Sequence, residues 1–409
     1  MILFQNAKLI PFLSGGADGL HDVAVSGRHI QAIAPAGTIA ARDADRVLPL
    51  NGRTLMPGMF DLHMHMYFVT DNFADLGARS LNQHLIDSIS YLNLFLERGY
   101  TTVRDCGSPH FIGVTLRDAI AKGIIKGPRV FAAGTCISPT SKGNNTFPNL
   151  YREVDRPEDL MGAARQEYSQ GVDFLKYMAT GSVANDTGEP GACITTPQEL
   201  TAITRAARSL GTYVAAHCHG TTGIFHCIRT GVGTIEHASF LTKDCIRLIL
   251  EMGNRTALVP TLSPLCELYE DKEGTAPPHL KAKVEDMFLA AHMLQEAGQA
   301  GVRIGWGTDS SMKFYAAHPG YEFYARKQAG FSTEEMLRQA TIQSAEILGL
   351  SDRLGTVEVG KLADLIVLDN DPLSDITAAM EKAPVLVMKE GSMFPHLCPA
   401  PSKYPRALS

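Results

Sequence analysis

The sequence predicts an α/β protein in which a (β/α)8 barrel of the TIM type, residues 58–355, carries a small β-sandwich domain built from both chain termini, residues 1–57 and 356–409. Short apolar segments alternate with amphipathic ones through the middle of the chain, whereas both ends show alternating apolar and polar residues punctuated by Gly and Pro. A content of 45% hydrophobic and 20% charged residues in a chain of 409 is typical of a globular protein with a sizeable core.

The two ends are predicted to form half-exposed sheet. Their period of two places alternate side chains on opposite faces of a strand, which suits a strand with one buried face. The segments concerned are "ILFQNAKLI", "DVAVSGRHIQAIAP" and "DRVLPLNGRTLMPG" at the start, and "LGTVEVGKLADLIVLDND" and "PVLVMKEGSMF" near the end.

The middle of the chain supplies eight strand candidates separated by helical segments, which is the count of a (β/α)8 barrel. The strand candidates are "GMFDLHMH", "TTVRDCG", "RVFAAGTCIS", "VDFLKYMATG", "YVAAHCHG", "GTIEHASF", "TALVPTLS" and "RIGWGTDSS". Helices are predicted over Leu81–Arg98, Pro157–Gln170, Pro197–Leu210 and Leu280–Ala300, two of them opening on a proline suited to a first helical turn. An open doubly wound sheet has the same alternation, but no GxGxxG follows the first strand, so we favour the barrel.

Charge and hydropathy exclude several classes of partner. A net charge of −6 offers no basic patch for nucleic acid, and no apolar run approaches the roughly 18 residues of a membrane helix. The N-terminus lacks the early positive charge and apolar core of a signal peptide, and the eight cysteines are scattered singly. We therefore expect a cytoplasmic protein with reduced thiols, no nucleic acid or membrane partner, and a small-molecule substrate.

Polar residues collect at the C-terminal ends of the strand candidates, the edge where a barrel assembles its active site. They are His63 and His65, Lys176, His217 and His219, His237, and Asp309. The spacing of His63 and His65 turns both side chains to one face, so both can reach one cation. Imidazole nitrogen suits zinc and a carboxylate can complete the set, so the joint placement predicts a metal centre.

Lys176 is an unusual residue for an apolar strand, because a buried ammonium without a partner is costly. One interpretation pairs it with Asp173 or Asp105. The other is that its neutral amine reacts with carbon dioxide, giving an anionic carbamate whose two oxygens can bridge two cations.

These residues together resemble the amidohydrolase superfamily, as do "RTLMPGMFDLHMH", "GTIEHASF", "GWGTDSS" and "VEVGKLADLIVLD". The chain is most similar to the binuclear branch of prolidase-like dipeptidases, ochratoxin-degrading amidases and imidazolonepropionase-like enzymes. The resemblance implies two divalent cations, with zinc the first choice. It implies that His63, His65 and Asp309 bind the more buried ion. It further implies that His217 and His237 bind the more exposed one, and that N6-carboxylysine at Lys176 bridges the two.

The substrate side of the site is less defined. The resemblance puts a substrate-contacting Tyr or His at His219, which could equally orient another ligand. The Gly-Gly-His loop of relatives is replaced by "SPTSKGNNTFP", where Lys142 either pairs with a substrate carboxylate or is exposed. Tyr177 either lines the site or belongs to the core. Arg104 and Asp105 are interpreted as a buried ion pair under the barrel.

The resemblance implies hydrolysis of an amide C–N bond, in an Xaa-Pro dipeptide or an N-acyl amino acid. A hydroxide bridging the cations would attack the carbonyl, with Asp309 as general base and then general acid. Either His219 or the more exposed cation would assist the carbonyl. The alternatives are a mononuclear deaminase or cyclic-amide hydrolase, and a non-catalytic scaffold. No acid follows His217 as in deaminases, and all six ligand positions are filled, unlike in scaffolds. Relatives are often oligomers, so a homo-oligomer is expected, with "HLCPAPSKYPRALS" a candidate contact or loose tail.

Overall fold

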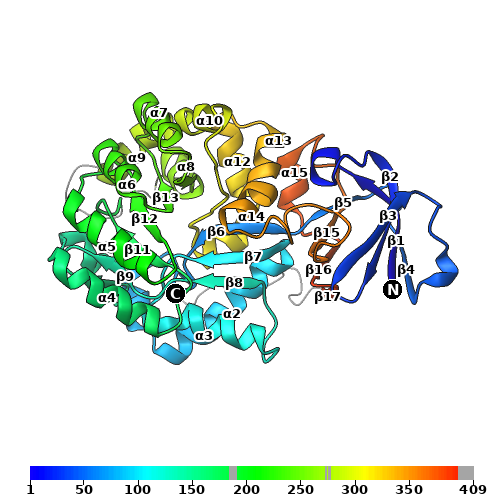
Figure 1. Ribbon diagram of the computed structural model, residues 1–409, viewed down its shortest axis with the longest axis horizontal. Helices are drawn as coiled ribbons and strands as arrows, with labels where there is room; N and C mark the ends of the chain where they lie inside the picture. The colour runs from blue at the N-terminus through cyan, green and yellow to red at the C-terminus, as the bar shows by residue number, and fades with distance from the viewer. Residues whose placement is uncertain (184–190, 272–273, 275–277, 395–409) are drawn as a thin grey trace.

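The central part of the chain has a mixed α/β fold with parallel sheets (Figure 1). The computed structural model describes residues 1–183, 191–271, 274 and 278–394. Two parallel sheets have the orders β6-β7-β8 and β10-β9-β11-β12-β13-β14. Their strands are β6 (Met59–Met64), β7 (Tyr100–Asp105), β8 (Arg129–Ala132), β9 (Cys136–Ser138), β10 (Tyr151–Glu153), β11 (Leu175–Met178), β12 (Val214–Cys218), β13 (Thr234–His237) and β14 (Ala257–Val259). The third strand candidate is thus divided into β8 and β9.

Backbone hydrogen bonds also run between these sheets. The amide of Asp173, just before β11, donates to the carbonyl of Ala132 in β8 at 2.8 Å. The eighth strand candidate forms only an isolated parallel bridge, Leu258 with Ile304, so its prediction as a strand is wrong. The segment nevertheless bonds on both sides, because the amide of Gly305 donates to β14 and its neighbour Trp306 accepts from Leu62 of β6.

Helices cover the outside of the parallel strands (Figure 1). They are α1 (Phe73–Ala78), α2 (Leu81–Glu97), α3 (Ile112–Ala121), α4 (Pro157–Ser169), α5 (Pro197–Ser209), α6 (Thr221–Thr230), α7 (Lys243–Glu251), α8 (Ser263–Glu270), α9 (Pro278–Leu289), α10 (His292–Gln299), α11 (Met312–Ala317), α12 (Tyr321–Gln328), α13 (Thr333–Arg338), α14 (Ser344–Ile347) and α15 (Ile376–Glu381). The proline-led helices α4 and α5 begin where predicted, and Thr196 and Glu199 close a capping box on α5. The single helix predicted over Leu280–Ala300 is instead two, since Ala291 and Met293 bond three residues back and interrupt the α-helical pattern.

Strands from both termini form a third sheet of eight strands, in the order β17-β16-β15-β5-β1-β2-β3 with β4 paired to β1. They are β1 (Ile2–Leu9), β2 (Gly19–Ser26), β3 (His29–Pro35), β4 (Arg46–Pro49), β5 (Thr54–Pro57), β15 (Leu365–Leu368), β16 (Leu386–Lys389) and β17 (Ser392–Phe394). Hydrogen bonds join all eight into one sheet, and the predicted β-sandwich arrangement stays a prediction. The β5–β15 pairing brings the two ends of the chain together, and a separate apolar cluster that includes Phe4, Leu55 and Val367 packs on this sheet.

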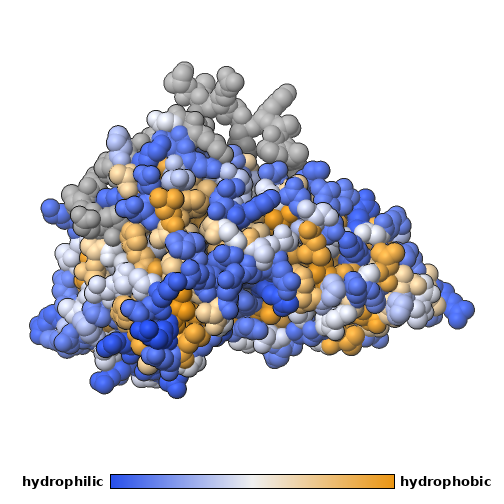
Figure 2. All heavy atoms as spheres, turned by 90° about the horizontal axis from the view of Figure 1, so that it is seen from above, coloured by the Kyte–Doolittle hydropathy of each residue, from blue (hydrophilic) through white to orange (hydrophobic). Residues whose placement is uncertain are grey.

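The largest apolar cluster lies between the parallel strands and their helices, and includes Leu175, Ile203 and Ile235. No helix of the described residues has the length and apolar character to cross a membrane. The seven cysteines within the described ranges are free thiols, and Cys398 lies outside those ranges with the rest of the C-terminal segment. Figure 2 shows hydrophobic residues on one face in several groups separated by hydrophilic ones.

Candidate metal centre

Polar side chains from successive strand ends meet around one small cavity of about 60 Å³. The predicted residues that line it are His65, Lys176, His217, His237 and Asp309. Six of the predicted residues, His63 among them, form two groups of three, and within each group the ligand atoms lie within 4.8 Å of one another. We name them the His63 group (His63, His65 and Asp309) and the His217 group (His217, His219 and His237). The rings of His63 and His237 join the two groups, with centroids 4.8 Å apart.

In the His63 group, both imidazoles direct Nε2 toward one carboxylate. Nε2 of His63 and Nε2 of His65 each lie 3.7 Å from Oδ1 of Asp309. The opposite nitrogens are occupied, because Nδ1 of His65 donates to the carbonyl of Gly107 at 2.6 Å and Nδ1 of His63 donates to Glu236 at 2.8 Å. Each ring therefore keeps Nε2 available for a cation.

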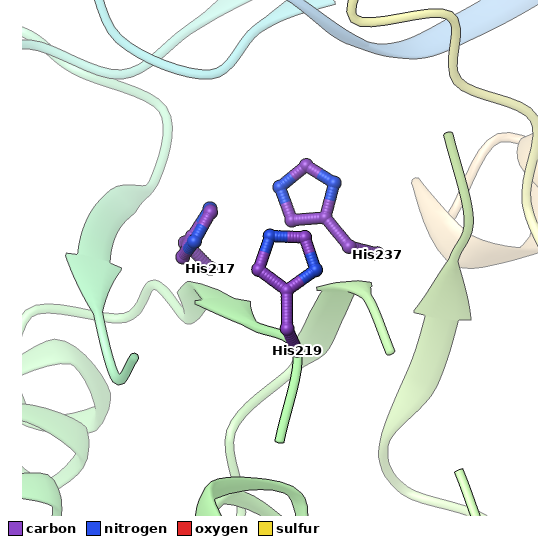
Figure 3. A group of neighbouring side chains, drawn as sticks. All are labelled: His217, His219 and His237. Atoms are coloured by element: carbon purple, nitrogen blue, oxygen red, sulfur yellow. The ribbon is translucent and has the colours of Figure 1, made fainter. Parts of the chain in front are cut away.

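The His217 group comes from the ends of β12 and β13, and its three rings face one another (Figure 3). All three ring pairs have centroids 4.6 Å apart. Nδ1 of His237 bonds to Thr261 Oγ1 at 2.7 Å, and Nδ1 of His219 bonds to Ser239 Oγ at 2.9 Å. His217 differs, because its Nε2 donates to the carbonyl of Gly181 at 3.3 Å and leaves Nδ1 for a ligand.

Lys176 is buried in β11, and its ammonium nitrogen has no hydrogen-bond partner within the described residues. Asp173 instead pairs with Arg117 at 2.8 Å, and Asp105 accepts from Ser108 and from the amide of Met66. The interpretation that paired Lys176 with either aspartate is therefore wrong. A lysine buried without a partner is costly in an ordinary core.

The backbone is left-handed at two of the site residues, with φ of 71° at His237 and 50° at Asp309. Such angles cost non-glycine residues on the order of 1–2 kcal/mol and gather at functional sites. In a regular strand His237 would face away from its inward neighbour Glu236. The positive φ turns the His237 ring inward as well. The Asp309 turn is held by its amide, which donates to the carbonyl of His63 at 2.8 Å.

Glycine allows the segment before Asp309 to approach β6. A Cβ on Gly307 would lie 2.7 Å from Cβ of His63 and 3.0 Å from Cγ1 of Val259. Only a residue without a side chain fits between these strands. This close approach brings Asp309 to His63 in β6 and to His65 just after it.

An acidic side chain that the sequence analysis did not select supports His63. Glu236 is fully buried, and both its carboxylate oxygens accept from Nη2 of Arg104 at 2.7 Å. The interpretation of Arg104 in a buried ion pair is correct, but its partner is Glu236 rather than Asp105. The signal was present as a charged residue inside the apolar strand "GTIEH", because a buried charge needs a partner.

Burial sets the charge of the site. It lowers the pKa of His65 and His219 to about 3 each, assisted in both by the positive charge of Lys176. Burial also raises the pKa of Asp309 to about 7, which Lys176 opposes. The imidazoles are therefore neutral near pH 7, the form that binds metal.

Three predicted substrate contacts lie outside the cavity lining. His219 is buried and does not line the cavity, and Lys142 is exposed on the 3-10 turn Lys142–Thr146. Tyr177 points to the opposite side of β11 from Lys176, where its hydroxyl bonds Thr195 Oγ1 at 2.8 Å within the main core. Its placement corrects the prediction that it binds substrate, since strand alternation turns it toward the helices.

Comparison with known proteins gives independent evidence of the family to which this chain is related. The Amidohydrolase family model matches residues 54–393. Ochratoxinase of Aspergillus niger is 28% identical over 379 residues, covering 83% of this chain and 75% of that protein. Imidazolonepropionase of Thermoplasma volcanium is 23% identical, covering 80% of each. The crystal structure of a prolidase complexed with N-methylphosphonate-L-proline is 29% identical with a TM-score of 0.85, covering 96% of this chain and 99% of that one.

Proposed function

Because this chain belongs to the amidohydrolase family, we propose that it is a binuclear metal-dependent hydrolase of an amide C–N bond. The observation that carries the proposal is a set of buried polar atoms at one site that have no hydrogen-bond partner within the described part of the chain. These atoms are Nε2 of His63, Oδ1 of Asp309 and Nζ of Lys176. Buried polar atoms are normally paired, so their grouping is expected where a ligand completes them.

The donor set suits two divalent cations. His63, His65 and Asp309 would hold one ion, and His217 and His237 the other, with N6-carboxylysine at Lys176 between them. Neutral imidazole and carboxylate favour zinc, although other first-row metals accept the same donors. The choice of His217 over His219 is supported by the cavity, which His217 lines and His219 does not.

When bound, the cations would supply a water of lowered pKa and polarise the substrate carbonyl. Asp309 would accept the proton of the attacking water and return it to the leaving nitrogen. His219, fixed by Ser239, would hold the orientation of the neighbouring imidazoles.

The proposed substrates are Xaa-Pro dipeptides and N-acyl amino acids. Similarity to a prolidase and to ochratoxinase supports this choice. Similarity to imidazolonepropionase adds cyclic amides as a second class to test.

We also propose that the parallel sheets close into a (β/α)8 barrel over residues 58–355, with the terminal sheet as a second domain. The bonds of residues 303–306 to both β14 and β6 support closure. Assembly into a homo-oligomer and a cytoplasmic location remain predictions, which light scattering and cell fractionation would test.

The test is metal depletion and return. Protein dialysed against a chelator should lose hydrolysis of N-acetyl-alanine and Ala-Pro, and regain it when about two equivalents of zinc are added, with metal quantified in the same sample. Full activity in the depleted protein would contradict the proposal. Release of ammonia from purines or pyrimidines, with no amide cleavage, would instead indicate a deaminase.

A further inference from the structure

A buried ion pair on α12 lies outside both proposed ion-binding groups. Glu322 and Arg326 stand one helical turn apart, and Nε of Arg326 donates to Oε1 of Glu322 at 2.7 Å. The exposed fraction is 2% for Glu322 and 0% for Arg326. Two charges removed from water are costly, and well-packed apolar residues often stabilise a fold equally well. The other contacts of the two side chains therefore indicate what this pair does.

Glu322 holds the start of α8. Its Oε2 accepts from the amides of Leu262 and Ser263 at 3.0 and 2.8 Å, and from the Ser263 hydroxyl at 2.7 Å. Leu262 is the N-cap of α8, and a leucine side chain cannot accept the hydrogen bonds that the first amides of a helix need. A carboxylate from another helix supplies that acceptor. Thr261, which supports His237, directly precedes the bonded amides, so Glu322 fixes the chain on one side of it.

Arg326 holds two segments at once. Its Nη2 donates to the carbonyl of Pro260 at 2.9 Å and to that of Gly305 at 3.3 Å. Pro260 directly precedes Thr261, so the ion pair bonds the chain on both sides of that threonine. Gly305 belongs to the segment that leads to Asp309, and the guanidinium also lies 4.4 Å from the centre of the indole ring of the next residue. One arginine thus joins the end of β14 to the segment that carries Asp309.

The two segments that the pair holds serve different ion-binding groups. Thr261 bonds to Nδ1 of His237 in the His217 group, whereas Asp309 belongs to the His63 group. Glu236 and Thr261 each bond to a ring of one group. The pair on α12 differs from both, because it is bonded to segments that lead to both groups.

We propose that Glu322 and Arg326 are positioning residues that hold donors of both ion-binding groups in place. They act on the His217 group through Thr261, and on the His63 group through the segment that leads to Asp309. The inference rests on the proposed binuclear site and adds a link between its two halves. Neither side chain is among those that line the cavity, so neither would touch the substrate.

The zinc affinity of a charge-neutral variant tests the link. Glu322→Gln keeps one oxygen acceptor but removes the charge beside Arg326. The full metal-free chain is titrated with zinc in competition with a chelating dye, which gives a dissociation constant for each group. Both should rise by about fivefold, the size of one lost neutral hydrogen bond. Glu334→Gln breaks an exposed pair of the same spacing on α13, with Arg338, and should change neither constant.

A double variant separates positioning from a general loss of stability. Where Glu322 acts through Thr261, Thr261→Val removes the path, and Glu322→Gln should add little at the His217 group. The double variant should therefore bind zinc there about fivefold more weakly, not about 25-fold, which is the product of two independent losses. At the His63 group Glu322→Gln should have its full effect in either background. A generally loosened fold would instead give additive losses at the His217 group.

Two milder variants keep the test available if Glu322→Gln does not fold. Arg326→Lys retains a positive charge but replaces the guanidinium fork that spans Glu322, Pro260 and Gly305 with a single ammonium, so both constants should rise. Ser263→Ala removes one hydrogen bond to Glu322 without changing any charge, and should weaken the His217 group alone.

Three outcomes would overturn the inference. Unchanged zinc affinity in folded Glu322→Gln would show that the pair serves only the fold, and so would fully additive losses in the double variant. Weakening confined to one group would show that the pair does not link the two. A wild-type chain that binds zinc at neither group would instead contradict the proposed function itself.

Discussion

The His63 group and the His217 group adjoin each other, yet different contacts hold them. His63 is fixed by a fully buried ion pair, since Glu236 accepts from its Nδ1 and is itself bound by Arg104. The rings of the His217 group are fixed by neutral groups, the hydroxyls of Thr261 and Ser239 and the carbonyl of Gly181. Charged partners hold an imidazole more strongly than neutral ones, so the His63 group should bind its ion more tightly.

Lys176 belongs to neither group. Replacing it should remove the difference in metal affinity between the two groups. In Lys176→Ala we expect both ions to be lost and kcat/KM to fall by more than about 10⁴-fold, because water activation and carbonyl polarisation are lost together. Metal per chain and turnover should be measured with and without acetate or propionate, which should restore part of both. Lys122→Ala, at an exposed position, is the control. Retention of two ions in Lys176→Ala would contradict the bridging role.

A substitution at Asp309 should distinguish its role in ion binding from its role in proton transfer. Asp309→Asn keeps an oxygen near His63 and His65 but cannot accept a proton, so kcat should fall by about 10³-fold with a smaller change in KM. Metal analysis should still find an ion in the His217 group. A kcat within tenfold of wild type would show that another residue moves the proton.

Glu236→Gln tests the charged support directly. The variant keeps an oxygen for His63 but removes the charge and leaves Arg104 buried without a counter-ion. We expect the affinity of the His63 group for zinc to fall by about 10- to 100-fold, as for other supports of a metal-bound histidine. Titrating metal-free protein with zinc in competition with a chelating dye measures each ion. Equal weakening of both ions would contradict the comparison.

Acid should destabilise the metal-free protein. Burial keeps five histidines neutral when folded, so between about pH 3 and their ordinary pKa of 6.5 the unfolded chain binds more protons. Buried carboxyl groups of raised pKa act in the opposite direction, and five are found among the described residues. The histidines of the site are His63, His65, His217, His219 and His237, burial also lowers the pKa of His84, and the carboxyl groups are Asp61, Asp105, Glu167, Asp309 and Glu322. The free energy of unfolding should therefore rise from pH 4.5 to 6.5, by about 1.4 kcal/mol per pH unit for each net proton.

This pH trend is measured by urea unfolding in the presence of a chelator. Zinc should flatten it, because a bound cation excludes protons from the imidazoles. A stability that falls as pH rises over this range would mean that the carboxyl groups dominate.

The smallest expected effect is in the neutrally supported group. Thr261→Val preserves shape but removes the 2.7 Å hydrogen bond to His237. Loss of one neutral hydrogen bond predicts about fivefold weaker zinc binding at the His217 group and little change at the His63 group. The same dye competition measures it, with Glu236→Gln as the matched comparison.

Much of the site follows from local sequence rules. Strand alternation brought His63 to His65, and the rule that active sites form at the C-terminal ends of parallel strands brought both to Asp309. The inward turn of His237 could not be predicted in the same way, since a left-handed φ at a histidine has no sequence signature. The pairing of Arg104 with Glu236, 132 residues away, required the arrangement of the strands.

In the fold, too, features set by local sequence were predicted correctly, whereas features set by long-range pairing were not. Helices α4 and α5 begin on Pro157 and Pro197 because proline suits a first helical turn. The eighth strand candidate was misjudged because its apolar pattern does not show that the segment pairs with its neighbour through only a single bridge. The terminal strands were placed together correctly, but whether they form one sheet or two depends on long-range pairing, which alternation alone does not specify.

The close approach of Gly307 to His63 has a consequence for the order of events during synthesis. The contact joins residues far apart in sequence, so it cannot form until the chain as far as Gly307 has left the ribosome. A nascent chain that ends before residue 309 carries every proposed imidazole ligand but lacks the carboxylate. We therefore expect metal loading to follow formation of this contact, so that metal content reports the fraction of chains that have finished folding.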